Sequence, residues 1–119
     1  MVTIPQHRTD GGLNDLSGFL GDIEGRLSIG DWTVNVRECL GEAASQVEAL
    51  GQSDNLTPER LRDLYSSIYQ TIDGEFVGRF KGHVVCRLIV VDSSFWHIEA
   101  TPEFEAYMLQ KYGAYSSDA

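Results

Sequence analysis

The sequence has few cysteines and no long apolar run. Its two cysteines, Cys39 and Cys86, fall inside predicted regular elements, and a chain of 119 residues can bury a core without disulfides. We expect both to be small buried side chains in a reducing compartment. The longest apolar run, HVVCRLIVV, is interrupted by Arg87 and is much shorter than the ~20 residues of a membrane-spanning helix. The N-terminal stretch lacks the apolar centre of a secretory signal, so a cytoplasmic location without membrane contact is predicted.

Motifs that hold metals, phosphates or nucleophiles are also missing. The histidines His7, His83 and His97 form no H-x-x-x-H pattern, and the cysteines form no C-x-x-C pattern. The sequence contains no G-x-x-x-x-G-K loop, no strand-led G-x-G-x-x-G and no G-x-S-x-G elbow. The sequence therefore predicts no metal and no cofactor, and it favours a binding protein over an enzyme.

Positive charge is scarce. Nine Lys and Arg residues stand against eighteen Asp and Glu residues, which gives a net charge of −9 at pH 7. Such a chain is repelled by nucleic acid and by anionic membrane, because both are polyanions. The excess of acid suits a partner with a basic surface, although solubility alone explains it equally well.

Apolar residues at steps of three and four predict four helices, over roughly 13–28, 31–50, 58–72 and 102–112. In the second, Trp32, Val36 and Leu40 belong to an apolar arc of ~80° on an ideal helix. The third and fourth begin with the same letters, T-P-E. In each, a threonine serves as N-cap and proline takes the first helical position.

The apolar period changes after Gly74. Alternating and β-branched residues predict strands over roughly 75–81, 83–91 and 94–100, joined as an antiparallel meander. The predicted fold class is α+β, with the helices against one side of this three-stranded sheet. Residues 1–12 are predicted to be an irregular N-terminal arm, and residues 13–119 a single domain.

His97 and Glu99 are the residues most suggestive of catalysis. On a strand, Trp96 and Ile98 face the core while Phe95, His97 and Glu99 face the other way. A histidine beside a carboxylate can act as a general base, but it needs a pocket and usually a nucleophile or a metal. We therefore interpret the pair as part of the solvent-exposed face of a strand. A small enzyme that uses His97 and Glu99 is the third hypothesis.

Acidic residues on the first two predicted helices form the candidate partner-binding site. Asp31, Glu38 and Glu42 lie within ~40° of one another on an ideal helix, and Asp15 and Asp22 share a face of the first helix. The predicted binding residues are Asp15, Asp22, Asp31, Glu38 and Glu42. A solvated helix face is the competing interpretation of this stripe.

The leading hypothesis is a small acidic inhibitor of the immunity or nucleic-acid-mimicking type. It would occlude a basic surface of a partner protein, such as a nuclease or a nucleic-acid-binding protein, and opposite charge would speed the encounter.

The second hypothesis is a structural or adaptor subunit of a protein assembly, either a homo-oligomer such as a homodimer or a hetero-oligomer. It would use either the glycine face Gly18, Gly21 and Gly25 or the exposed aromatics Phe95 and Tyr115. The glycines also fit a frayed helix. A minor hypothesis is that Arg79, Lys81 and Arg87, on an acid-free stretch, bind an anion or pair with carboxylates of this molecule or of a second copy.

Overall fold

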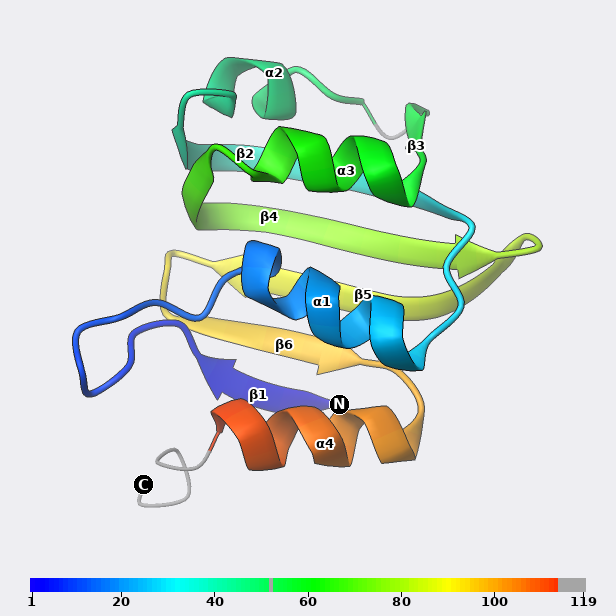
Figure 1. Cartoon of the computed structure of the whole chain (residues 1–119). Coiled ribbons are helices and arrows are strands. Elements are labelled where there is room, and N and C mark those ends of the chain that lie inside the picture. Colours follow the sequence, from blue (N-terminus) through cyan, green and yellow to red (C-terminus); the bar gives the residue numbers. More distant parts are fainter. Residues whose placement is uncertain (52, 114–119) are drawn as a thin grey trace.

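The protein is an α+β structure built on one six-stranded antiparallel sheet (Figure 1). The computed structural model describes residues 1–51 and 53–113. The strands lie in the order β1-β6-β5-β4-β2-β3. Their bounds are β1 Val2–Pro5, β2 Asp31–Gly41, β3 Asn55–Leu56, β4 Ile68–Phe80, β5 His83–Val91 and β6 Phe95–Glu99. The helices are α1 Leu16–Arg26, α2 Ala44–Glu48, α3 Pro58–Tyr65 and α4 Pro102–Tyr112.

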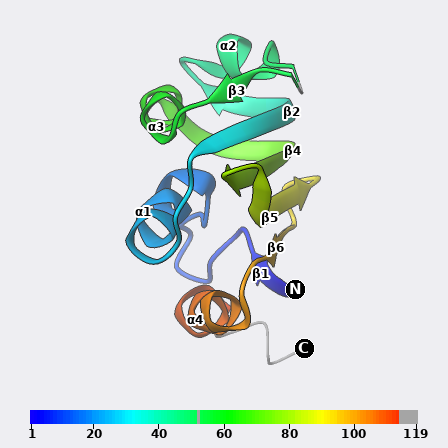
Figure 2. The same ribbon diagram turned by 90° about the vertical axis from the view of Figure 1, so that its right-hand side faces the viewer.

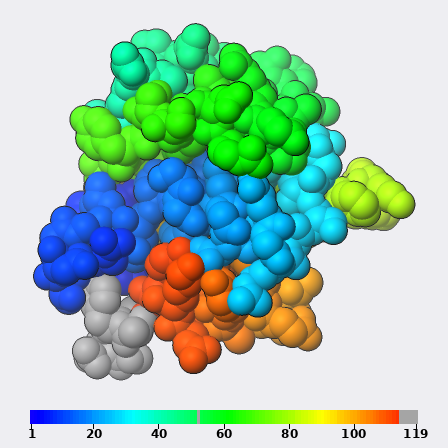
Figure 3. All heavy atoms as spheres, in the orientation of Figure 1, coloured from blue at the N-terminus to red at the C-terminus, as the bar shows by residue number. Residues whose placement is uncertain are grey.

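Three helices cover one face of the sheet and leave the other face open. α1, α3 and α4 lie on the same side, with α1 between the other two (Figures 2 and 3). The short helix α2 packs beside β2, near the β2–β3 edge of the sheet. The tip of the β4–β5 hairpin projects beyond the helices (Figure 3). The molecule therefore has a helical face, an open sheet face and two different sheet edges.

The prediction of a helix over 31–50 is wrong, because most of this range forms β2. Positions 32, 36 and 40 are four residues apart, and this spacing fits a helix and a strand equally well. Val34 distinguishes the two. A helix would turn it away from the apolar arc, whereas β2 buries Trp32, Val34 and Val36 on one face. Only Ala44–Glu48 of the predicted helix is helical.

Two further predictions need correction for related reasons. The third helix ends at Tyr65, and Ile68 and Ile72, which the helical pattern included, belong to β4. The N-terminal segment is not irregular throughout, because Val2–Pro5 pairs with β6 as an edge strand. Pro5 ends this strand, as expected at a sheet edge. The predicted meander β4-β5-β6 exists, but β1 extends it on one side and β2 and β3 on the other.

The predicted starts of α3 and α4 and the predicted orientation of β6 are confirmed. The Thr57 side chain accepts a hydrogen bond from the Arg60 amide, and Thr101 accepts one from the Phe104 amide. Proline occupies the first turn of both helices. In β6, Trp96 and Ile98 are fully buried while Phe95 and Glu99 are exposed. Local capping chemistry and strand alternation therefore predicted these elements correctly.

A buried polar network joins the core elements around Asp15, which is 6% exposed. Its carboxylate accepts hydrogen bonds from the Thr71 amide and hydroxyl, both at 3.0 Å, and from Gln6 Nε2 at 3.3 Å. The Tyr65 hydroxyl lies 2.8 Å from Thr71 Oγ1. Burial raises the pKa of Asp15, although hydrogen bonds from Thr71 oppose the rise. The network fixes α1, α3 and β4 to the segment that follows β1.

Replacing Asp15 with alanine is expected to lower the free energy of unfolding by about 2–3 kcal/mol, since the buried Thr71 amide and Gln6 amide lose an acceptor. Tyr65→Phe, which removes one hydroxyl from the same network, is expected to lower it by only about 1 kcal/mol. Urea denaturation at neutral pH measures both changes. Equal stability of Asp15→Ala and the wild type would show that the network contributes nothing.

Candidate functional site

The structure separates the five predicted binding residues. Asp15 lies in the buried network, and Asp22 of α1 is 8% exposed beneath α4. Asp31 begins β2 and lies opposite Arg79 of β4, whereas Glu38 lies near the end of β2 and Glu42 just after it. At ~3.3 Å per residue, Asp31 and Glu38 are about 23 Å apart along the strand. Only Glu38 and Glu42 remain as exposed neighbours in the chain.

Asp22 holds α4 against α1. One carboxylate oxygen accepts hydrogen bonds from Tyr107 Oη at 2.8 Å and Lys111 Nζ at 2.7 Å, and the other accepts one from Tyr112 Oη. Burial opposes ionisation of this carboxyl, but hydrogen bonds from Lys111, Tyr112 and Tyr107 outweigh it and lower its pKa. Asp22 therefore has a structural partner on each oxygen.

Glu38 and Glu42 belong to a larger acidic surface, which we name the acidic edge. It runs from the end of β2 through α2 and β3 to the first turn of α3, along the β2–β3 edge of the sheet (Figure 1). Its carboxylates are Glu38, Glu42, Glu48, Asp54 and Glu59, and all five residues are exposed. Residues 38–59 contain no Lys, Arg or His, so no cation within this segment balances them.

None of these five carboxylates forms an ion pair within 4.0 Å in the part of the chain that the structure describes. Glu48 Oε2 accepts a hydrogen bond from the Cys39 amide of β2, and Asp54 Oδ2 accepts one from the Gly51 amide. The first bond satisfies the Cys39 amide, a backbone donor at the edge of the sheet. Charged side chains at an edge also discourage pairing with another chain. The remaining carboxylate oxygens are available to solvent or to a partner.

Sequence reasoning missed Glu48, Asp54 and Glu59 because it looked for one face of a helix. The signal that identifies them is the run without cations from 38 to 59. A count of charge along the chain finds this run without any assumption about secondary structure. Short elements at a sheet edge then bring the acids of one continuous segment to one side of the molecule.

The open face of the sheet is the second candidate surface. Residues that are cross-strand partners form rows across this face. One row crosses Thr33, Val77, Arg87 and Glu99. The next crosses Asn35, Glu75, Ile89, His97 and Thr3. A third consists of Val91, Phe95 and Pro5. Polar and charged residues occupy the centre of this face, and apolar residues occupy the end near the β5–β6 turn.

His97 and Glu99 share this face but have different neighbours. His97 Nδ1 lies 3.2 Å from the Thr3 hydroxyl. Glu99 Oε1 lies 3.6 Å from Arg87 Nη1, and Arg87 Nε lies 3.2 Å from Glu75 Oε2. Each carboxylate is therefore drawn toward Arg87 rather than toward the imidazole. Arg87 thus pairs with carboxylates of its own molecule, one of the alternatives that its acid-free stretch left open.

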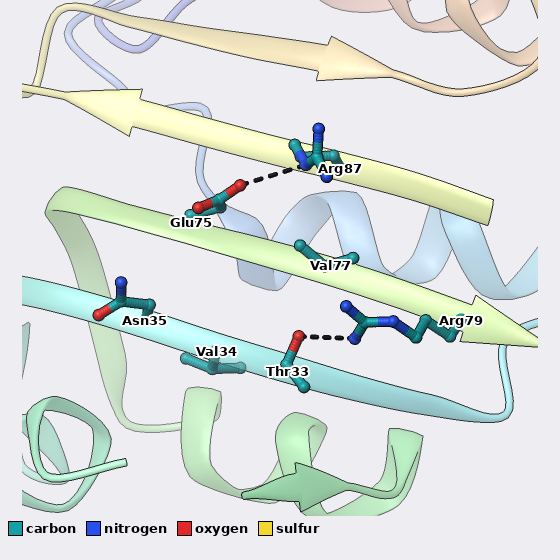
Figure 4. A pocket seen from close by; sticks show the side chains of 7 residues that line it. All are labelled: Thr33, Val34, Asn35, Glu75, Val77, Arg79 and Arg87. Carbon is teal, nitrogen blue, oxygen red and sulfur yellow. Dashed lines mark hydrogen bonds and ion pairs between the residues drawn. The ribbon is translucent and has the colours of Figure 1, made fainter. Parts of the chain in front are cut away.

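A hollow of about 270 Å³ lies on the open face beside Arg87 (Figure 4). Arg79 Nη1 donates a hydrogen bond to Thr33 Oγ1 at 2.8 Å, so its guanidinium lies back over β2. Val77 is at the centre of the view, and Asn35 and Glu75 are on the other side from Arg79. Arg79 has no carboxylate within 4.0 Å among the described residues. The hollow thus carries charges of both signs above an apolar floor.

The other residues singled out from the sequence are the three glycines of α1, the two cysteines and Tyr115. Gly18, Gly21 and Gly25 lie on the exposed side of α1, and a Cβ at any of them would meet nothing within 4 Å. The described chain therefore does not pack closely against this face. Cys39 and Cys86 are buried free thiols, and burial raises their pKa to about 11 and about 12. Both are protonated at neutral pH, which makes them poor nucleophiles. Tyr115 lies outside the described residues.

Acid is expected to weaken the attachment of α4 through Asp22. Because the folded pKa of Asp22 is below its unfolded value of 3.8, its contribution to stability is present above 3.8 and is lost as the pH falls through the folded pKa. We expect Asp22→Asn to be less stable than the wild type at pH ~7, with a difference that shrinks below pH ~4. Thermal unfolding of both proteins across this range measures it. A difference that grows in acid would contradict the assignment.

No helix in the described residues is long and apolar enough to cross a membrane. Nor does any group of three or more His, Cys, Asp and Glu side chains within residues 1–51 and 53–113 have an arrangement that could hold a metal ion. Comparison of the chain with models of protein families, with curated proteins and with solved structures found no match.

Proposed function

We propose that the protein is a small acidic inhibitor of the immunity or nucleic-acid-mimicking type, acting in the cytoplasm. Its partner is a protein with a basic surface, such as a nuclease or a nucleic-acid-binding protein. The observation that supports this proposal is the acidic edge: five exposed carboxylates without an ion pair among the described residues, on a segment without a cation. Glu38 and Glu42 carry over from the sequence-based site, and Glu48, Asp54 and Glu59 extend it.

The proposed mechanism is occlusion. Lysines and arginines that bind phosphates would meet the carboxylates of the acidic edge, which carry the same sign of charge as a nucleic-acid backbone. Charge-assisted hydrogen bonds between arginine and carboxylate supply geometry as well as energy. The net charge of −9 attracts a basic partner from a distance and raises the association rate at low salt. Asp15 and Asp22 are not used, because their oxygens have partners inside the protein.

The outward position of these acids supports function over stability. Like charges on one segment repel one another, so the acidic edge weakly destabilises the isolated protein. A basic partner would remove this repulsion on binding. The β2–β3 edge also lies at the opposite end of the sheet from β1 and β6, so a partner on this edge leaves the β1–β6 end uncovered.

A pull-down from the source cells tests the proposal. The tagged protein is used as bait at ~50 mM and at ~500 mM salt, where the Debye length falls from roughly 14 Å to roughly 4 Å. We expect a stoichiometric basic protein that is retained at low salt and lost at high salt. Partners that are acidic, or that remain bound at high salt, would reject charge-directed occlusion.

Neutralising two residues of the acidic edge is expected to weaken binding to the captured partner. Glu38→Gln with Glu42→Gln should lower the association rate by roughly 3–10-fold at low salt and should reduce its salt dependence. The matched control is Ala106→Lys with Gln110→Lys, at exposed positions of α4. It changes the net charge by the same +2 at a distant place. Stopped-flow mixing compares the variants. Equal losses in both would mean that net charge, rather than the acidic edge, directs the encounter.

A further inference from the structure

The open face of the sheet is a broad surface with no covering layer in the described chain. The molecule measures 39 × 30 × 20 Å, and the sheet extends along the two longer dimensions (Figures 1 and 2). A face of this outline is large enough for the ~800 Å² per partner of a stable protein interface. The helical face, in contrast, is filled by α1, α3 and α4 (Figure 3).

Charge on the open face is nearly balanced, although the protein as a whole is strongly acidic. The residues of this face that carry charge are Asp31, Glu38, Asp73, Glu75, Glu99, Arg37, Arg79 and Arg87, for a net −2. Arg37 pairs with Asp73 at 3.0 Å, and Arg87 lies between Glu75 and Glu99. Two molecules that each carry −9 repel one another. The repulsion is least where they meet through this balanced face.

An exposed apolar strip lies at one end of the same face. Val91 and Phe95 are cross-strand neighbours, 52% and 45% exposed. Ile89 is half-buried one row away beside His97, whereas Pro5, the partner of Phe95 on β1, is buried. Aromatic and aliphatic side chains of this kind form the centres of protein interfaces, with polar residues around them.

We propose that the open face joins two copies of this chain in a symmetric homodimer, with the two-fold axis parallel to the strands between β5 and β6. Rotation about this axis places each β5 residue over the partner's copy of the β6 residue with which it pairs in the sheet. Val91 then faces the partner's Phe95, and Ile89 faces the partner's His97. Arg87 faces the partner's Glu99, so an arginine meets a carboxylate on both sides of the axis. The face is thus complementary to itself, as an isologous interface requires.

The same axis keeps the acidic edges apart. Each acidic edge lies beside β2 and β3, at the far end of the sheet from β1 and β6. Rotation about an axis between β5 and β6 places the two acidic edges at opposite ends of the dimer. Strands β1, β6, β5 and β4 of one copy then pack on the same four strands of the other, with strand directions aligned to within the ~30° of aligned sheet packing. A basic foreign partner would be drawn to the acidic edges instead, and an acidic one would be repelled.

Sedimentation equilibrium of the full chain tests this inference. We expect a monomer–dimer equilibrium between ~1 and ~500 µM, with tighter association at ~500 mM than at ~50 mM salt because screening reduces the repulsion between the two net charges. Binding through the acidic edge has the opposite dependence on salt, so failure of one proposal is distinguishable from failure of the other. A monomer at all these concentrations, or a dimer that dissociates at high salt, would overturn the inference.

Substitutions on the two faces locate the interface. Phe95→Asp and Val91→Asp are each expected to raise the dimer dissociation constant at least tenfold. The matched control is Leu109→Asp on α4, which is 42% exposed on the other side of the sheet and should leave the constant unchanged. Circular dichroism and the thermal midpoint confirm that each variant is folded. Loss of the dimer in Leu109→Asp alone, or in none of the three, would place the interface elsewhere.

Discussion

The carboxylate of Asp15 connects parts of the chain that are far apart in sequence. It stands at the start of α1 and binds Thr71 of β4 and Gln6 after β1, while Tyr65 at the end of α3 contacts Thr71. The adjacent Asn14 accepts a hydrogen bond from Trp96 Nε1 of β6. Burying a carboxylate without a cation is unfavourable unless hydrogen bonds replace its water. The surrounding elements must therefore hold their positions to keep these bonds, and this constraint fixes how α1 and α3 sit on the sheet.

Acidic residues in this protein have two distinct roles, which their neighbours decide. Asp15 and Asp22 face inward, and each is surrounded by donors from other elements. Glu38, Glu42 and Glu59 face outward on a segment without cations. A net charge alone does not distinguish these roles. The acids of residues 38–59 have no ion pair among the described residues and lie along one sheet edge, whereas most charged side chains of the open face pair with one another.

Much of the fold could be predicted from local signals. The threonine caps and prolines gave the starts of α3 and α4, and strand alternation gave the direction of Trp96 and His97. The failure at Trp32–Leu40 has a definite cause: apolar residues four apart satisfy both the helical and the strand period. Val34 and the β-branched neighbours carried the deciding information. The short edge strands β1 and β3 could not be predicted, since four and two residues show no usable period.

The candidate site was predictable only in part. Glu38 and Glu42 are exposed as predicted but lie in and just after β2 rather than on a helix, and Asp15 and Asp22 lie on a face that long-range contacts bury. Their donors, Thr71 and Lys111, lie far away in sequence, so no pattern within the first helix indicates them. The acid-free hairpin stands out in the sequence of an acidic protein. Its balance by Glu75 and Glu99 depends on strand pairing, which sequence periodicity does not provide.

The pairing of β1 with β6 has a consequence for how the protein folds. Val2 lies opposite Ile98, so β1 is synthesised well before β6 and cannot join the sheet until β6 is present. Such non-local pairing requires a long loop to close, and the entropy lost in closing it precedes any stabilising contact. It therefore slows folding relative to helical proteins of the same size. During synthesis, β1 and the segment with Gln6 remain without their sheet partner. The molecule is therefore vulnerable to proteolysis and to wrong strand pairing until β6 has emerged from the ribosome.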